Sequence, residues 1–246
     1  MDAWFLAPAL ALVAGVLALA PLGQRVLERG VVFIDLAVAQ AAAAAALAAT
    51  VLGGHPPWPV VQACAIAGAF LVVALVAALA RWWPAQREAL IGLAYVASAC
   101  AALLTAQIDA HGGEHLHALL AADVLWSGWP QVALLVACAA LVGLVRRRLG
   151  GDVWFYATFA LVSSLAVQVL GLFVVFAALI APGLWRRAGL RFAAVFGLVI
   201  SAALLGLGAS WVMNAPSGPL VAFALALCGL GSIASPARHG RRDRRA

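Results

Sequence analysis

The chain has 246 residues, of which 66% are hydrophobic and only 10% are charged, and its mean hydropathy is +1.08. This composition leaves too little polar surface to cover a water-soluble globule, so lipid must be the main solvent of the folded chain. The net charge of +6 comes from arginines that stand in short clusters between apolar stretches, without an aromatic-rich basic face. We therefore expect no nucleic-acid partner and interpret the charge as a topology signal.

Long apolar stretches separated by short charged breaks organise the chain, and a span needs about 20 apolar residues to cross about 30 Å of hydrocarbon. Hydropathy predicts spans at residues 4–22, 30–52, 59–80, 89–107, 129–145, 192–213 and 220–234. The apolar block from Asp152 to Trp185 would make a single helix about 50 Å long, so we expect Gly171 to divide it into two short crossings or a re-entrant pair. The predicted fold class is all-α, a polytopic transmembrane helix bundle with about eight or nine spans.

The arginine clusters give the predicted orientation. The clusters lie at residues 25–29, 81–87, 146–148, 186–191 and 238–245. If the block at 152–185 crosses the membrane twice, all of these clusters fall on the same side of the bilayer. The positive-inside rule then places the carboxyl terminus in the cytoplasm of a multi-pass membrane protein. Residues 1–235 are expected to form one transmembrane domain, and residues 236–246 a basic, disordered cytoplasmic tail.

Asp35 is the acidic residue that lies well inside a clear predicted span. An ionisable group at that depth is costly and usually functional, so Asp35 is a candidate contact for a transported ion. The alternative is that Asp35 pairs with Arg25 or Arg29 near the interface and only fixes the helix register. Gln40, five residues later, is a second candidate contact on the ion pathway. It is rotated about 140° from Asp35 on a helix, so the two side chains do not share one face.

A second candidate site is the predicted external segment at residues 109–117. It contains a Gly-Gly hinge and five side chains of metal-binding type, which are Asp109, His111, Glu114, His115 and His117. Imidazole and carboxylate together suit zinc and similar divalent ions. The alternative is a solvated loop, because the spacing matches no defined structural zinc motif. The segment is interpreted as a site of weak metal capture.

The sequence contains no phosphate-binding glycine loop, no nucleophile with an arranged base and no metalloprotease helix motif. We therefore expect neither enzymatic activity nor a cofactor.

Five segments occur in an order that resembles the permease subunit of bacterial zinc/manganese/iron ATP-binding-cassette importers, over nearly the whole chain. They are RGVVFID (29–35), EALIG (88–92), LHALLAADVL (116–125), QVLGLFVVFAALIAP (168–182) and APSGP (215–219). The resemblance implies a homodimeric pore in the bacterial inner membrane. It also implies a cytoplasmic ATPase that supplies energy and an extracytoplasmic metal-binding protein that supplies the ion.

The chain departs from the family pattern at two points. The family's second span carries Asp and His four residues apart as metal contacts, whereas here Asp35 is followed by Ala39 and Gln40 is preceded by Leu36. The family's coupling segment before the sixth span is also missing, because Arg148 leads almost directly to Asp152.

If an ATPase docks, the contact must therefore fall to Arg186, Arg187 and Arg191. The leading hypothesis is a divergent permease for zinc or manganese. The alternatives are an ATP-independent channel or carrier and a non-transporting membrane scaffold of the same fold.

Overall fold

The protein is all-α over the residues that the structure, a computed structural model, describes, which are 5–31, 33–54, 56–83, 86–108, 112–120 and 122–234. The helices are α1 (Leu6–Arg29), α2 (Ile34–Leu52), α3 (Trp58–Trp82), α4 (Arg87–Ala106), α5 (Gly112–Leu120), α6 (Trp129–Val145), α7 (Asp152–Leu170), α8 (Leu172–Arg187), α9 (Phe192–Met213) and α10 (Ser217–Gly231). Two short 3₁₀ turns, η3 (Val124–Trp126) and η4 (Ser232–Ala234), complete the described chain.

Within the described residues, six helices are long and apolar enough to cross a membrane by length and composition: α1, α2, α3, α4, α7 and α9. Helices α6 and α10 are apolar but shorter. At 1.5 Å per residue, α6, α8 and α10 are each about 23–26 Å long, somewhat less than the hydrocarbon core. The expected membrane helix bundle is confirmed, whereas the count of eight or nine spans stays a prediction.

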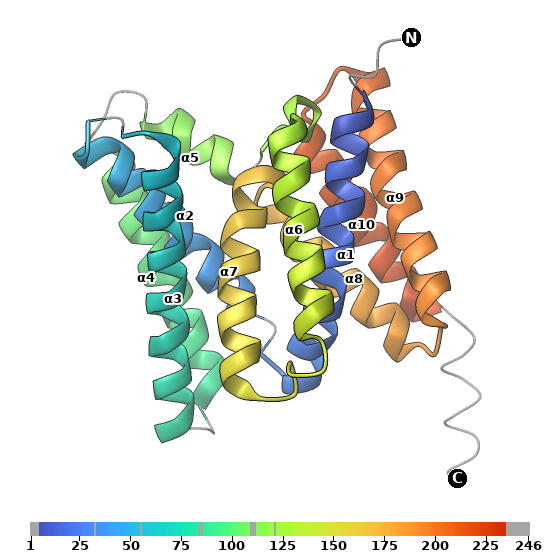
Figure 1. The fold of residues 1–246 in the computed structure, drawn as a ribbon, viewed down its shortest axis with the longest axis horizontal. Helices are drawn as coiled ribbons and strands as arrows, with labels where there is room; N and C mark the ends of the chain where they lie inside the picture. The colour runs from blue at the N-terminus through green and yellow to red at the C-terminus, as the bar shows by residue number, and fades with distance from the viewer. Residues whose placement is uncertain are drawn as a thin grey trace.

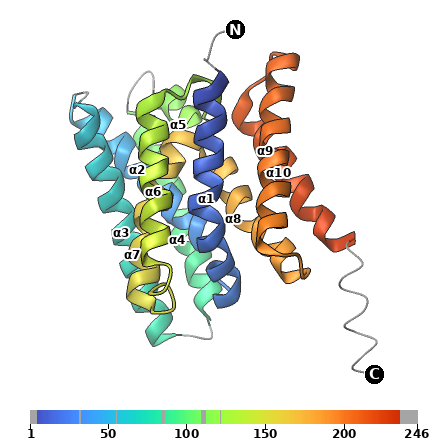
Figure 2. The ribbon, with the colours of Figure 1, turned by 45° about the vertical axis from the view of Figure 1, so that its right-hand side comes forward.

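The bundle has two lobes joined by a central helix. Helices α2, α3 and α4 pack together on one side, and α1, α6, α8, α9 and α10 form the other side (Figure 1). Helix α7 lies between them and contacts α1, α2, α3, α6 and α8. The view turned by 45° shows α9 and α10 at the outer edge of the larger lobe (Figure 2). Helices α2 and α7 therefore meet in the interior, where the candidate site lies.

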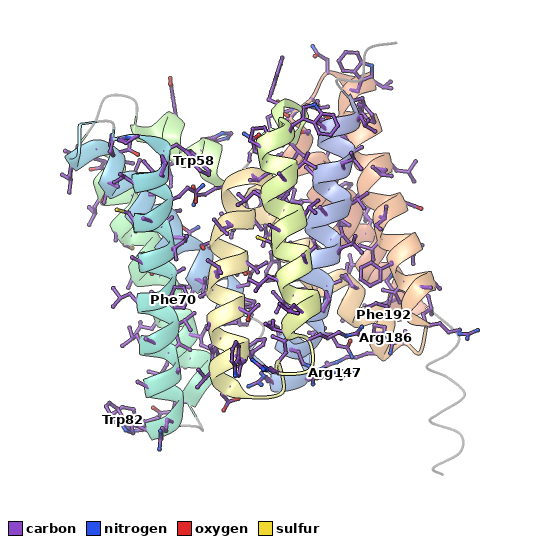
Figure 3. The ribbon with its side chains drawn as sticks, in the orientation of Figure 1. Trp58, Phe70, Trp82, Arg147, Arg186 and Phe192 are labelled. Carbon is purple, nitrogen blue, oxygen red and sulfur yellow. The ribbon has the colours of Figure 1, made fainter. Side chains whose placement is uncertain are left out.

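The described arginine groups gather at one end of the bundle, which we name the arginine end. Arg147 and Arg186 lie there together with Trp82, whereas Trp58 lies at the opposite end (Figure 3). Helix α1 also ends there, because Arg29 contacts the loop that precedes α7. This arrangement agrees with the predicted one-sided distribution of charge. The orientation in the membrane stays a prediction, and the expected tail at 236–246 lies outside the described residues.

Gly171 separates α7 from α8, as the excess length of the apolar block predicted. Helix α7 ends at Leu170 and α8 begins at Leu172, with Gly171 between them at φ 80° and ψ 158°. This backbone conformation is accessible to glycine and strained for residues with a Cβ. The glycine therefore makes the sharp turn between two helices that are buried along much of their length.

We expect Gly171→Ala to destabilise the protein by about 1–3 kcal/mol, because alanine must adopt the strained backbone or shift α8 against α7. Thermal unfolding of the purified protein in detergent measures the effect. Gly143→Ala in α6 is the matched control, since an added Cβ there meets open space. Equal unfolding temperatures for the two variants would contradict this role of Gly171.

Candidate functional site

Asp35 lies in the first turn of α2 and is completely buried. Neither of its carboxylate oxygens has a hydrogen-bond partner among the described residues. The positive end of the α2 dipole favours a negative charge at this position. An isolated buried carboxylate is nevertheless costly, and a proton or a bound cation removes that cost. Asp35 thus has the burial and the unused oxygens of a cation contact.

The alternative interpretation, in which Asp35 pairs with a nearby arginine, is wrong. Arg25 pairs with Glu28 on its own helix at 3.0 Å. Arg29 forms an ion pair with Asp152 and donates to the carbonyl oxygen of Gly150 at 3.0 Å. Both arginines lie on α1 and point to acceptors at the arginine end, so the helix register at Asp35 does not depend on an ion pair with either.

Ser163 on α7 is the residue that brings a second oxygen to Asp35. Its hydroxyl lies beside the carboxylate. Ser163 is also completely buried, and its hydroxyl oxygen has no hydrogen-bond partner in the described part of the chain. Two buried oxygen groups on facing helices therefore lie side by side inside the bundle. Sequence reasoning missed Ser163, although the Ser163-Ser164 pair interrupts an otherwise apolar helix.

Gln40 is buried in α2, as its position in the span predicted. It lies on a different face of the helix from Asp35. A buried glutamine on α3, Gln62, also has an unpartnered side-chain oxygen within the described residues. The antiparallel packing of α2 and α3 places Gln62 beside the carboxyl-terminal half of α2, away from Asp35, since Gly68 already packs against Ala41. The structure therefore does not gather Gln40 and Gln62 around Asp35.

The histidine segment is partly described. Residues 112–120 form α5, in which Glu114 and His117 are exposed. Asp109 and His111 lie outside the described residues, and so does the His115 side chain. Among the groups that the structure describes, no set of three His, Cys, Asp or Glu side chains converges. Metal capture by this segment stays a prediction, although α5 packs over α2, α7 and α8.

The expected Gly-Gly hinge in this segment is wrong. Gly112 and Gly113 form the first turn of α5 rather than a flexible loop. A Cβ added at Gly112 would lie 2.1 Å from the carbonyl oxygen of Ala106, at the end of α4. The first glycine therefore permits close packing of α5 against α4.

Asp123, which immediately precedes η3, has a structural role. Its carboxylate accepts hydrogen bonds from the backbone N–H of Leu125 and from the hydroxyl of Ser217. These bonds cap η3 and join it to the start of α10.

The three arginines expected to contact an ATPase lie at the corner between α8 and α9. Arg187 donates to the carbonyl oxygen of Leu27, and Arg186 donates to that of Leu190 at 2.7 Å. Arg191 precedes α9 and is exposed. The Arg187 side chain therefore ties the corner to α1, the Arg186 side chain bonds within the corner, and the Arg191 side chain is exposed.

The short loop between α6 and α7 contains no helix, as the sequence predicted. Helix α6 ends at Val145 and α7 begins at Asp152. Arg29 binds both Asp152 and the loop carbonyl groups and lies over the ring of Phe155 at 4.4 Å. The loop is thus fastened to α1.

Comparisons with known proteins identify the fold. The sequence matches no protein-family model, and no curated protein matches it. The fold is shared with a solved structure over nearly the whole chain, and this likeness concerns the fold alone.

One solved structure that shares this fold is PsaBC from Streptococcus pneumoniae in complex with Fab. The match has a TM-score of 0.73 and covers 92% of this chain and 89% of the other, with 17% sequence identity.

Proposed function

We propose that this chain is the membrane permease subunit of an ATP-binding-cassette importer for divalent metal ions, with zinc or manganese as the cargo. The observation that carries the proposal is the shared fold with a chain of PsaBC over 92% of the sequence. The buried, unpartnered carboxylate of Asp35 supports it independently, because a polar group of this kind inside a membrane bundle usually lies on a transport pathway.

The proposed mechanism is alternating access without covalent chemistry. A metal ion delivered by an extracytoplasmic metal-binding protein enters near α5, where Glu114 and His117 are exposed. It then passes the meeting of α2 and α7, where Asp35 supplies a negative charge and Ser163 a neutral oxygen. Oxygen ligands favour manganese at this inner position, whereas the histidines of the entry segment also suit zinc.

ATP hydrolysis is assigned to a separate cytoplasmic subunit that docks at the arginine end, and two copies of the permease form the pore. Arg191 is the proposed charged contact, because Arg186 and Arg187 are bonded within the chain. The short loop between α6 and α7 favours an alternative, an ATP-independent channel or carrier of the same fold. A scaffold that does not transport is the third possibility.

Uptake of radioactive manganese and zinc into proteoliposomes tests the proposal. The purified protein is reconstituted with and without its co-isolated ATPase. Metal uptake by each preparation is then measured in a defined buffer with and without ATP. We expect uptake that requires both ATPase and ATP. Uptake by the protein alone would replace the proposal with the channel or carrier, and absence of flux in every preparation, with folded protein present, would favour the scaffold.

A further inference from the structure

A groove between α3 and α7 opens at the arginine end of the bundle. Its volume is about 760 Å³. Its walls are mostly apolar and come from both helices, with Phe70, Val73, Ala74 and Ala77 on α3 and Val153 and Ala157 on α7. Its charged residues are Arg29, Arg81 and Asp152. The groove is separate from Asp35 and from the corner between α8 and α9, so the proposed transport does not use it.

The length of the groove matches one leaflet of a bilayer. Phe70 lies part-way along α3, and Trp82 marks the arginine end of the same helix (Figure 3). At a rise of 1.5 Å per residue, Phe70 is about 16 Å from Arg81, which is about half of the 30 Å hydrocarbon core. Trp82 and Trp83 are exposed at this end, as aromatic residues at the headgroup level usually are. The apolar walls therefore face one acyl layer, and the charges face the headgroups.

The net charge of the groove is positive. Arg29 and Asp152 form an ion pair, so their charges balance, and exposed Arg81 remains as the surplus cation. A guanidinium group binds a phosphate oxygen pair well, and basic pockets between membrane helices on the cytoplasmic side, where we expect the arginine end, bind anionic headgroups. The apolar walls exclude a fully hydrated ligand and suit a hydrocarbon chain.

We propose that the groove binds one anionic glycerophospholipid from the leaflet at the arginine end. The phosphate lies against Arg81 at the mouth of the groove, and an acyl chain lies along Ala74 towards Phe70. The lipid fills the space that the groove leaves between α3 and α7 at this end of the bundle. The inference does not depend on the metal-transport function.

Native mass spectrometry of the purified protein tests the headgroup contact. The protein is titrated with dioleoyl phosphatidylglycerol or, as a neutral comparison, with dioleoyl phosphatidylcholine. We expect one phosphatidylglycerol to be retained in preference to phosphatidylcholine. Arg81→Gln should weaken that retention about five-fold, the effect of one arginine near an anionic headgroup. Arg147→Gln, at an exposed arginine of the same end outside the groove, should leave it unchanged.

A second pair of variants tests the acyl-chain contact. Ala74→Trp fills the groove and should also reduce phosphatidylglycerol retention, whereas Ala194→Trp, on an exposed position of α9, should not. The proposal is overturned if Arg81→Gln and Arg147→Gln retain lipid equally. It is also overturned if Ala74→Trp changes the oligomeric state without changing lipid retention, because a second copy of the chain would then cover the groove.

Discussion

Asp35→Asn should lower metal uptake in proteoliposomes at least ten-fold while leaving the protein as stable as the wild type, or more stable, in metal-free buffer. The amide has nearly the shape of the carboxylate but carries no charge to attract a cation. Both polar atoms stay in the same buried place, where the carboxylate oxygens have no hydrogen-bond partner among the described residues. Burying an isolated charge costs more than burying a neutral amide, so the substitution should not lower stability.

The two readouts separate a functional carboxylate from a structural one. Asp123→Ala is the matched control, because that carboxylate caps η3 and bonds Ser217. Its loss should lower stability by about 1 kcal/mol. Ser163→Ala should reduce uptake less than Asp35→Asn, since it removes a neutral oxygen and retains the charge. A parallel fall of stability and uptake in Asp35→Asn would show that Asp35 holds the bundle together and would remove it from the transport pathway.

The sequence predicts those features of the fold that depend on local composition. The block at 152–185 is too long for one span, so its division at Gly171 follows from length and the conformational freedom of glycine. The depth of Asp35 follows from its place in an apolar stretch. The one-sided arrangement of the arginine clusters follows from the same count of crossings.

Features that depend on distant contacts were not predictable in this way. The partner of Arg29 is Asp152, more than a hundred residues away, so the sequence suggested nearby Asp35 instead. Ser163 becomes a candidate only because α7 packs against α2. Gly112 resembles a hinge in the sequence, but its packing against Ala106 places it in a helix.

Gly23→Ala should have the largest effect on stability, because α1 and α8 meet there through their backbones. A Cβ added at Gly23 would lie 1.9 Å from the carbonyl oxygen of Leu179 and 2.5 Å from its carbonyl carbon. Helices inside lipid associate by close packing of small residues. The atoms of Leu179 that overlap belong to its backbone, so no side-chain movement can relieve the overlap. The two helices must separate, and we expect a loss of about 3 kcal/mol or more.

Two further glycines give a graded series that tests this explanation. A Cβ at Gly183 on α8 would lie 2.3 Å from Cδ1 of Leu27, the end of a flexible side chain that can rotate away. Gly183→Ala should therefore cost about 1 kcal/mol, near the lower limit for overpacking. Gly197→Ala on α9 meets open space and should be neutral or slightly stabilising. Unfolding in mixed detergent micelles measures all three, and any other order of stability would show that backbone contact between α1 and α8 does not limit how closely the larger lobe packs.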